Sequence, residues 1–85
     1  MDQEQEQIKR QLLIRIGNRI RSLREKRGIS QAELGRRCLQ GSSWMARIEN
    51  GRINSSIFTY HLVAEALEVN LDELFKVNTD KKSEQ

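Results

Sequence analysis

Apolar residues recur along this chain at helical spacing, and no stretch shows the sustained alternation of a β-strand. The first helix is expected from about residue 5 to Lys26. Gly28 and the basic residues before it are suited to ending this helix. Its apolar face is made by Leu13, Ile16, Ile20 and Leu23 and is extended toward the N-terminus by Ile8 and Leu12. Gly17 lies inside this helix, which indicates that another backbone passes close to it.

Capping signals predict two short helices in the middle of the chain. Ser30 followed three residues later by Glu33 is a capping box and opens the second helix. The pattern breaks at residues 39–42, and a third helix begins at Gly41 or Ser42 and ends near residues 50–51. Two short helices joined by a tight break have the spacing of a helix-turn-helix unit.

Two further helices are expected in the last third. A cap at residues 54–56 opens the fourth, and a signal resembling a capping box at residues 70–73 opens the fifth, which includes Leu74 and Phe75. The apolar face of the fourth helix is made by Ile57, Tyr60, Val63, Ala64 and Leu67. We predict an all-α domain over residues 8–77, after a polar N-terminal segment (residues 1–7) and before a disordered polar tail (residues 78–85).

Charge is distributed unevenly along the 85 residues, which suffice for one domain. Residues 8–52 hold twelve Lys or Arg against three acidic residues, whereas residues 1–7 and 53–85 are both acidic on balance. This uneven distribution of charge favours a polyanionic partner for the middle of the chain. Charge alone would be explained equally well by a solvated cationic face.

The sequence argues against an enzyme and against a membrane protein. Cys38 is the only cysteine, which excludes an internal disulfide, and it is expected to fill the core. His61 is the only histidine, and neither a phosphate loop nor a set of metal ligands is present, so no cofactor or metal is expected. The N-terminus is acidic and the longest apolar runs have three residues, which predicts a soluble, cytoplasmic protein.

The third helix has two different faces. Met45 and Ile48 are three residues apart and are expected to face the core. The second helix of a helix-turn-helix inserts its first turn into the major groove of DNA. The face available for base edges is made by Ser42, Ser43, Trp44 and Arg47.

Four blocks of sequence, at residues 16–24, 30–34, 47–51 and 67–75, resemble the phage-repressor family, also called Cro/CI or Xre-like regulators. The resemblance covers residues 16–75. It implies a compact five-helix lambda-repressor-like DNA-binding domain, here with an N-terminally extended first helix, that binds double-stranded operator DNA as a two-fold homodimer.

The resemblance also assigns roles to single residues. Ser42, Ser43, Trp44 and Arg47 match the base-contacting positions. Residues that match phosphate-contacting positions are Gln31, Asn50, Arg52 and Asn54. Arg24 and Glu49 match an ion pair that ties the first helix to the third. The alternative is that Glu49 only satisfies hydrogen-bonding groups at a helix end.

The chain departs from the family pattern around the turn. Leu39 stands where the family has glycine, so the glycine of the turn, Gly41, comes two positions late, and Leu39 is expected to supply an apolar plug. Gly35 holds a place usually taken by alanine, where any small residue would permit close packing. Trp44 either packs beneath the turn against Leu39 or is exposed on the DNA face.

Two surfaces are candidates for dimerisation. One surrounds the fifth helix, and the other lies on the extended first helix; we favour the fifth-helix surface with the extension packed across it. The candidate residues are Leu71, Leu74, Phe75 and Val77 on the former, and Ile8, Leu12 and Leu13 on the latter.

The sequence therefore predicts a sequence-specific transcriptional regulator, and a repressor in particular because the chain has little room for an activating domain. The alternative is an antitoxin or other protein-binding adaptor that uses the apolar residues 8–13, or the fifth-helix surface, to bind a protein partner. A neighbouring gene for a small basic toxin would favour that alternative.

Overall fold

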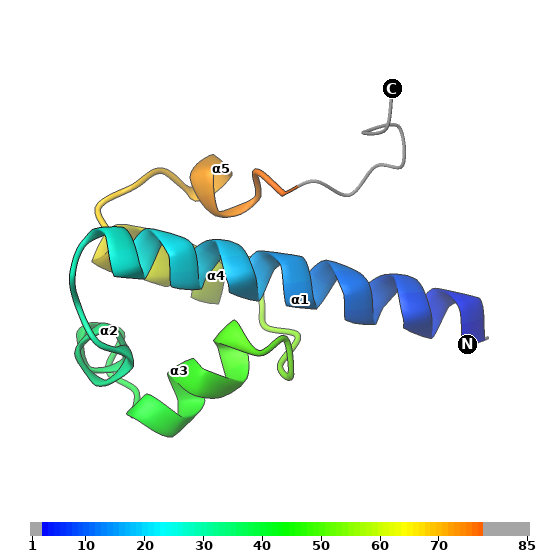
Figure 1. The fold of residues 1–85 in the computed structure, drawn as a ribbon, viewed down its shortest axis with the longest axis horizontal. Helices are drawn as coiled ribbons and strands as arrows, with labels where there is room; N and C mark the ends of the chain where they lie inside the picture. The colour runs from blue at the N-terminus through cyan, green and yellow to red at the C-terminus, as the bar shows by residue number, and fades with distance from the viewer. Residues whose placement is uncertain (1–2, 78–85) are drawn as a thin grey trace.

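The computed structural model describes residues 3–77, which form five helices and no strand (Figure 1). Their order is α1 (Gln3–Lys26), α2 (Gln31–Arg37), α3 (Ser42–Glu49), α4 (Ile57–Ala66) and α5 (Leu71–Leu74). The predicted all-α, five-helix architecture is confirmed. The predicted polar tail, residues 78–85, lies outside the described residues.

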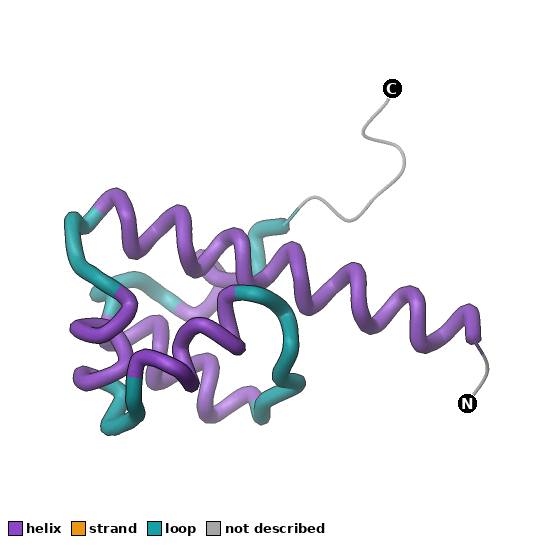
Figure 2. Tube along the Cα trace, turned by 60° about the horizontal axis from the view of Figure 1, so that its bottom comes forward, coloured by secondary structure: helices purple, strands orange, loops and turns teal. Residues whose placement is uncertain are grey.

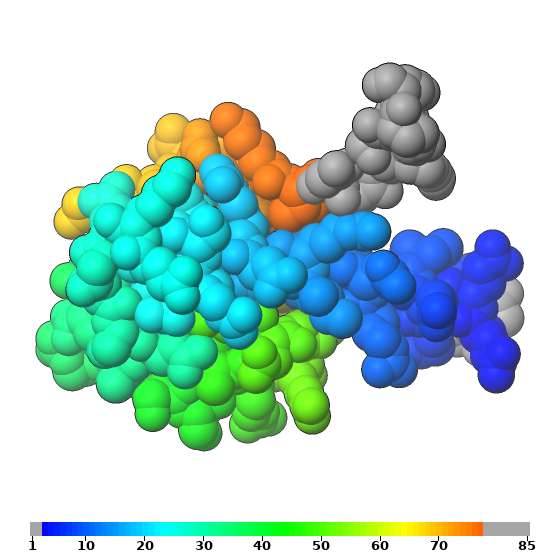
Figure 3. Space-filling model, in the orientation of Figure 1, coloured from blue at the N-terminus to red at the C-terminus, as the bar shows by residue number. Residues whose placement is uncertain are grey.

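The long helix α1 spans the body of the domain, and its N-terminal half extends beyond it (Figures 2 and 3). Its C-terminal half buries Ile16, Ile20 and Leu23. Ile8 on the extension is 61% exposed. The helix begins at Gln3, within the predicted polar segment and two residues before the expected start near residue 5. Acidic side chains in the first turn favour this early start, because they suit the positive end of the helix dipole.

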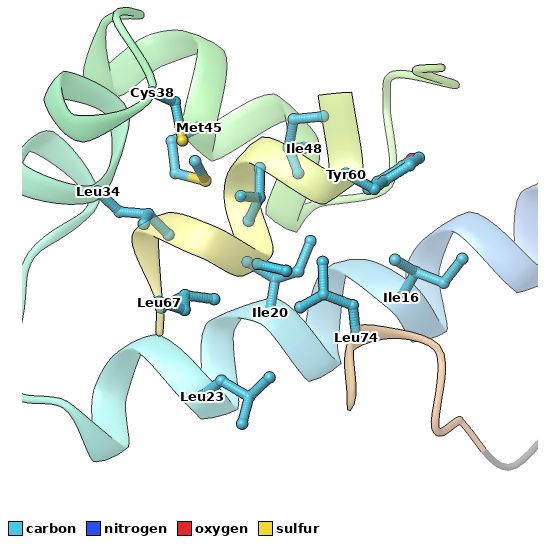
Figure 4. Close-up of a cluster of buried hydrophobic side chains, with 12 residues drawn as sticks. Ile16, Ile20, Leu23, Leu34, Cys38, Met45, Ile48, Tyr60, Leu67 and Leu74 are labelled. Atoms are coloured by element: carbon cyan, nitrogen blue, oxygen red, sulfur yellow. The ribbon is translucent and has the colours of Figure 1, made fainter. Parts of the chain in front are cut away.

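All five helices contribute to one hydrophobic core (Figure 4). Its largest fully buried apolar side chains are Ile20, Leu34, Met45, Val63, Leu67 and Leu74. Cys38 is buried in the same core, as predicted, and burial raises the pKa of its thiol. Within the described part of the chain, no helix is both long and apolar enough to cross a lipid bilayer.

The apolar face of α4 is shorter than its periodicity suggests. Tyr60, Val63, Ala64 and Leu67 are buried as predicted, but Ile57 is 61% exposed, so its placement in the core is wrong. Periodicity identifies the face on which a side chain lies. It does not show whether a neighbouring element covers that side chain, and within residues 3–77 Ile57 stays largely exposed.

The short helix α5 is held against α1 and α4. Arg19 donates from Nε to the carbonyl oxygen of Glu73 at 2.7 Å and from Nη2 to its carboxylate at 2.9 Å. The rings of Tyr60 and Phe75 meet edge to face with their centroids 5.7 Å apart. Phe75 follows the last helical residue rather than lying within α5 as expected.

The first four helices end in the same way. Each is followed by a residue in the left-handed conformation: Gly28 and Gly51, with φ of 70° and 72°, and Leu39 and Glu68, both with φ of 61°. At each end two backbone N–H groups donate back to the last turn, which is the Schellman arrangement. The predicted helix stops at Gly28 and Gly51 are confirmed. Leu39 and Glu68 occupy positions that favour glycine.

The turn between α2 and α3 is built around Leu39 in this conformation. The amide of Gln40 donates to the carbonyl of Gly35 at 2.7 Å, and the amide of Leu39 donates to that of Arg36 at 2.9 Å. The Leu39 side chain is 90% exposed, so the expected apolar plug is wrong. Leu39 stands where the family has glycine, and its backbone adopts the left-handed conformation that glycine favours. Leucine is strained in this conformation.

Replacing Leu39 with glycine is expected to stabilise the domain by about 1 kcal/mol, because it removes the left-handed strain and sacrifices almost no buried surface. For a domain of this size, the melting temperature should rise by about 4–8 °C. Leu39→Ala is the matched control, since it removes the same exposed side chain but keeps the strained conformation. An equal rise for both variants would show that strain at this position is not the cause.

Gly35 is required by the same turn. A Cβ atom built on it would lie 2.6 Å from the carbonyl oxygen of Gly41 and 3.3 Å from that of Gln40. The expectation that any small residue would serve at position 35 is therefore wrong. Gly35 therefore lets the backbone of the turn cross α2 closely.

Candidate DNA-binding surface

Helix α3 lies at the edge of the molecule, below α1 in the view of Figure 1, and it contacts both α2 and α1. Met45 and Ile48 anchor it in the core, with 0% and 2% of their surface exposed. Ser42, Ser43 and Arg47 lie on its exposed side. The two faces predicted for this helix are therefore present in the structure, and its outer face carries two hydroxyls and one cation.

The N-termini of α2 and α3 differ. Ser30 caps α2, since its hydroxyl accepts from the amide of Glu33 at 3.0 Å. The Glu33 carboxylate binds Arg36 and Arg37, and these two partners lower its pKa. Gly41 precedes α3 and provides no side-chain cap. The amide groups of the first turn of α3 are consequently left without a side-chain cap at the point where the helix would meet DNA.

Trp44 is half-buried and packs against the core. It does not pack beneath Leu39, since the side chain of Leu39 is almost wholly exposed. Because part of the indole contributes to packing, we expect removal of Trp44 to lower stability in addition to any effect on DNA. A base contact by its exposed part remains a prediction.

Glu49, the last residue of α3, is fully buried and joins three helices. Its carboxylate accepts from Arg24 Nε at 2.6 Å and from Arg24 Nη2 at 3.1 Å. It also accepts from Arg21 Nε at 3.4 Å and from Gln31 Nε2 at 2.9 Å. The hydrogen bond with Glu49 raises the pKa of the Arg24 guanidinium.

The structure thus brings Arg24 and Glu49 together, and it brings Gln31 to the same carboxylate. Only one of the two N–H bonds of the Gln31 amide is used in this contact, so the other can still donate to a phosphate. The buried ion pair therefore lies directly beneath one of the predicted phosphate contacts and holds it in place.

Arg21 is a site residue that the sequence interpretation missed. Its Nη2 donates to the Asn50 side-chain oxygen at 2.9 Å, while its Nε reaches Glu49. Arg21 thereby orients Asn50 in the loop after α3. The signal was present, because Arg21 and Arg24 are three residues apart and share one face of α1.

The loop after α3 is pressed against α1. A Cβ atom on Gly51 would lie 2.8 Å from the backbone nitrogen of Ile14, so only glycine fits there. Arg52 and Asn54, two of the predicted phosphate contacts, are both exposed on this loop. The loop is therefore a fixed support for these side chains, close to the C-terminal end of α3.

The predicted dimer surfaces are only partly available. Leu74 is 0% exposed within the single chain, so its assignment to an interface is wrong: it faces the core from α5. Leu71, Phe75 and Val77 are half-buried against that core. On the extension of α1, Ile8 and Leu12 remain exposed.

Comparison with known proteins agrees with this geometry. The family model for a helix-turn-helix domain matches residues 15–75. An immunity repressor protein of Bacillus phage phi105 is 33% identical over 70 residues, which are 82% of this chain. The chain belongs to the phage-repressor-like helix-turn-helix family. It spans about half (49%) of the length of this phage repressor.

Solved structures extend the family comparison. The restriction-modification controller protein C.AhdI from Aeromonas hydrophila is 33% identical, with a TM-score of 0.71 over 74% of this chain and 91% of that chain. A hypothetical transcription factor, NHTF from Neisseria, has a TM-score of 0.75 at 24% identity and covers 87% of this chain and 85% of that one, which shows a shared fold. The predicted class, a DNA-binding helix-turn-helix domain of the repressor type, is confirmed.

Proposed function

We propose that this helix-turn-helix protein is a cytoplasmic, sequence-specific transcriptional repressor that binds a two-fold operator as a homodimer, with α3 in the major groove. The observation that carries the proposal is the division of α3 into a buried face and an exposed polar face. The exposed Ser42, Ser43 and Arg47 offer hydrogen-bond donors and acceptors of the kind that read base edges.

The distribution of unpaired cations supports this orientation. Eight of the basic side chains in residues 3–77 bind a carboxylate or another oxygen of the chain. The basic side chains in this range that have no such partner are Arg10, Arg15, Lys26, Arg47 and Arg52. Arg47 on α3 and Arg52 on the loop after it are therefore free to bind DNA.

Arg47 and Arg52 are expected to respond differently when replaced. Arg47→Ala should relax the preference at one base pair by about 1–3 kcal/mol, because a base contact is lost. Arg52→Gln should weaken binding to operator and random DNA alike and reduce the salt dependence by about one phosphate contact. Titrations of both variants on both duplexes provide the measurement. Equal losses for Arg47→Ala on the two duplexes would contradict its role as a reader of bases.

We further propose that two copies pair through the extension of α1 together with the surface around α5. One recognition helix covers too few base pairs to select an operator, so a second copy is needed. Ile8 and Leu12 supply exposed apolar surface, and the half-buried Phe75 and Val77 lie at the edge of α5. The antitoxin alternative would use the same exposed residues to bind a different protein.

A further inference from the structure

We propose that the extension of α1 is a second DNA-binding element, in which Lys9 and Arg10 bind the phosphate backbone beside the half-site read by α3. This inference rests on the proposed function and deepens it. The family model begins at residue 15, so the extension lies outside the matched domain.

A groove separates the extension from the loop after α3. Lys9 and Arg10 line one wall, and Asn50, Arg52 and Asn54 line the other. Three of these five residues are the phosphate contacts already proposed for the loop. The groove therefore places the cations of α1 opposite side chains that are themselves expected to bind the DNA backbone.

The face of α1 that carries Arg10 is the face directed at α3 and its loop. Residues 10, 14 and 17 are separated by four and three positions, so they lie on one side of the helix. The backbone at Ile14 approaches Gly51, and the backbone at Gly17 approaches Ile48 of α3. Arg10 therefore continues, beyond the body of the domain, the same side of α1 that contacts the recognition helix.

The charge of the groove suits a polyanion. Arg10 and Arg52 have no partner within residues 3–77, and Lys9 is paired only with the exposed Glu6, at 3.3 Å. Among residues 3–77, Glu6 is the one carboxylate that lines the groove. An exposed pair of this kind contributes little stability, so a phosphate can displace Glu6 from Lys9 at small cost.

The dimensions of the extension also fit a backbone contact. Residues 3–14 of an α-helix span about 18 Å, at a rise of about 1.5 Å per residue. Duplex DNA carries one phosphate charge per about 1.7 Å of its axis, so a rod of this length can lie along several phosphates. The apolar stripe of Ile8 and Leu12 lies on a different face, which leaves it available for a second copy of the chain.

Three charge-neutralising variants test the proposal through changes of opposite sign. Arg10→Gln is expected to weaken binding to operator and random duplexes alike. The slope of log affinity against log salt concentration should decrease by the amount that corresponds to about one phosphate contact per protomer. Glu6→Gln is expected to tighten binding to both, because it frees Lys9. Lys26→Gln is the matched control: it removes an unpaired cation seven residues beyond Arg19, on the side of α1 that faces α5, and should leave both affinities unchanged.

The measurement is fluorescence anisotropy with labelled duplexes between 50 and 200 mM salt, together with sedimentation equilibrium to check that every variant keeps the wild-type mass. If the wild type binds DNA but Arg10→Gln has the salt dependence of Lys26→Gln, the inference about α1 is overturned. If the wild type binds neither duplex, the proposed function itself fails.

Discussion

Replacing Glu49 with glutamine is expected to lower the free energy of unfolding by about 3–5 kcal/mol, because it leaves a largely buried guanidinium without its counter-ion. The side chain of Arg24 is only 12% exposed, and that of Glu49 is 0% exposed. Glutamine has the same shape but no charge, and its amide nitrogen cannot accept the hydrogen bonds now made to one of the two carboxylate oxygens. The residue that joins three helices would thereby lose its charge and one of its two acceptor atoms.

Urea denaturation of the variant, monitored by circular dichroism, measures this loss. Glu73→Gln is the control, since it also removes one carboxylate that binds an arginine, here Arg19, but in a partly exposed position. Because Glu73 is 34% exposed, the control should cost no more than about 1 kcal/mol. Similar losses of unfolding free energy for both variants would show that the buried ion pair at Glu49 contributes no more to stability than the partly exposed one at Glu73.

The second large effect is expected from Gly17→Ala. A Cβ atom at this position would lie 2.7 Å from the carbonyl oxygen of Ile48 and closer still to that of Glu49. Both atoms belong to the backbone of α3, so relief requires the recognition helix to move away from α1. Overpacking of this kind costs about 1–3 kcal/mol, and more where the backbone cannot yield.

The sign of this effect is the test. In the interior of an unobstructed helix, alanine stabilises by about 1 kcal/mol relative to glycine. Gly17→Ala should instead lower the melting temperature, whereas Gly41→Ala, where no atom lies within 4 Å of the added Cβ, should change it little. A rise for Gly17→Ala would contradict the close approach of α1 and α3 on which the geometry of the DNA-binding surface depends.

Local signals in the sequence predict most helix boundaries. The serine cap at Ser30 and the glycine stops at Gly28 and Gly51 depend on residues a few positions apart, and the structure confirms them. The close backbone approach at Gly17 was also predicted, because glycine inside a helix is costly unless space requires it. These features follow from the chemistry of neighbouring residues.

Features that depend on contacts between distant segments were predicted less well. The turn at Leu39 could not be derived, because its conformation is coupled to Gly35 through the carbonyl of Gly41. Leu74 was assigned to an interface because it belongs to an apolar cluster around the fifth helix, yet its side chain is fully buried in the core. Periodicity identifies an apolar residue but not the element that will cover it.

Selection of bound sequences from a random DNA pool tests the central proposal most directly, namely that the α3 helices of two copies read a two-fold operator. The account predicts two inverted half-sites whose centres lie about 34 Å apart, or a multiple of that distance. Arg47→Ala should return the same spacing with one base pair less well defined. A pool without an enriched sequence, or with a single unrepeated half-site, would contradict the account.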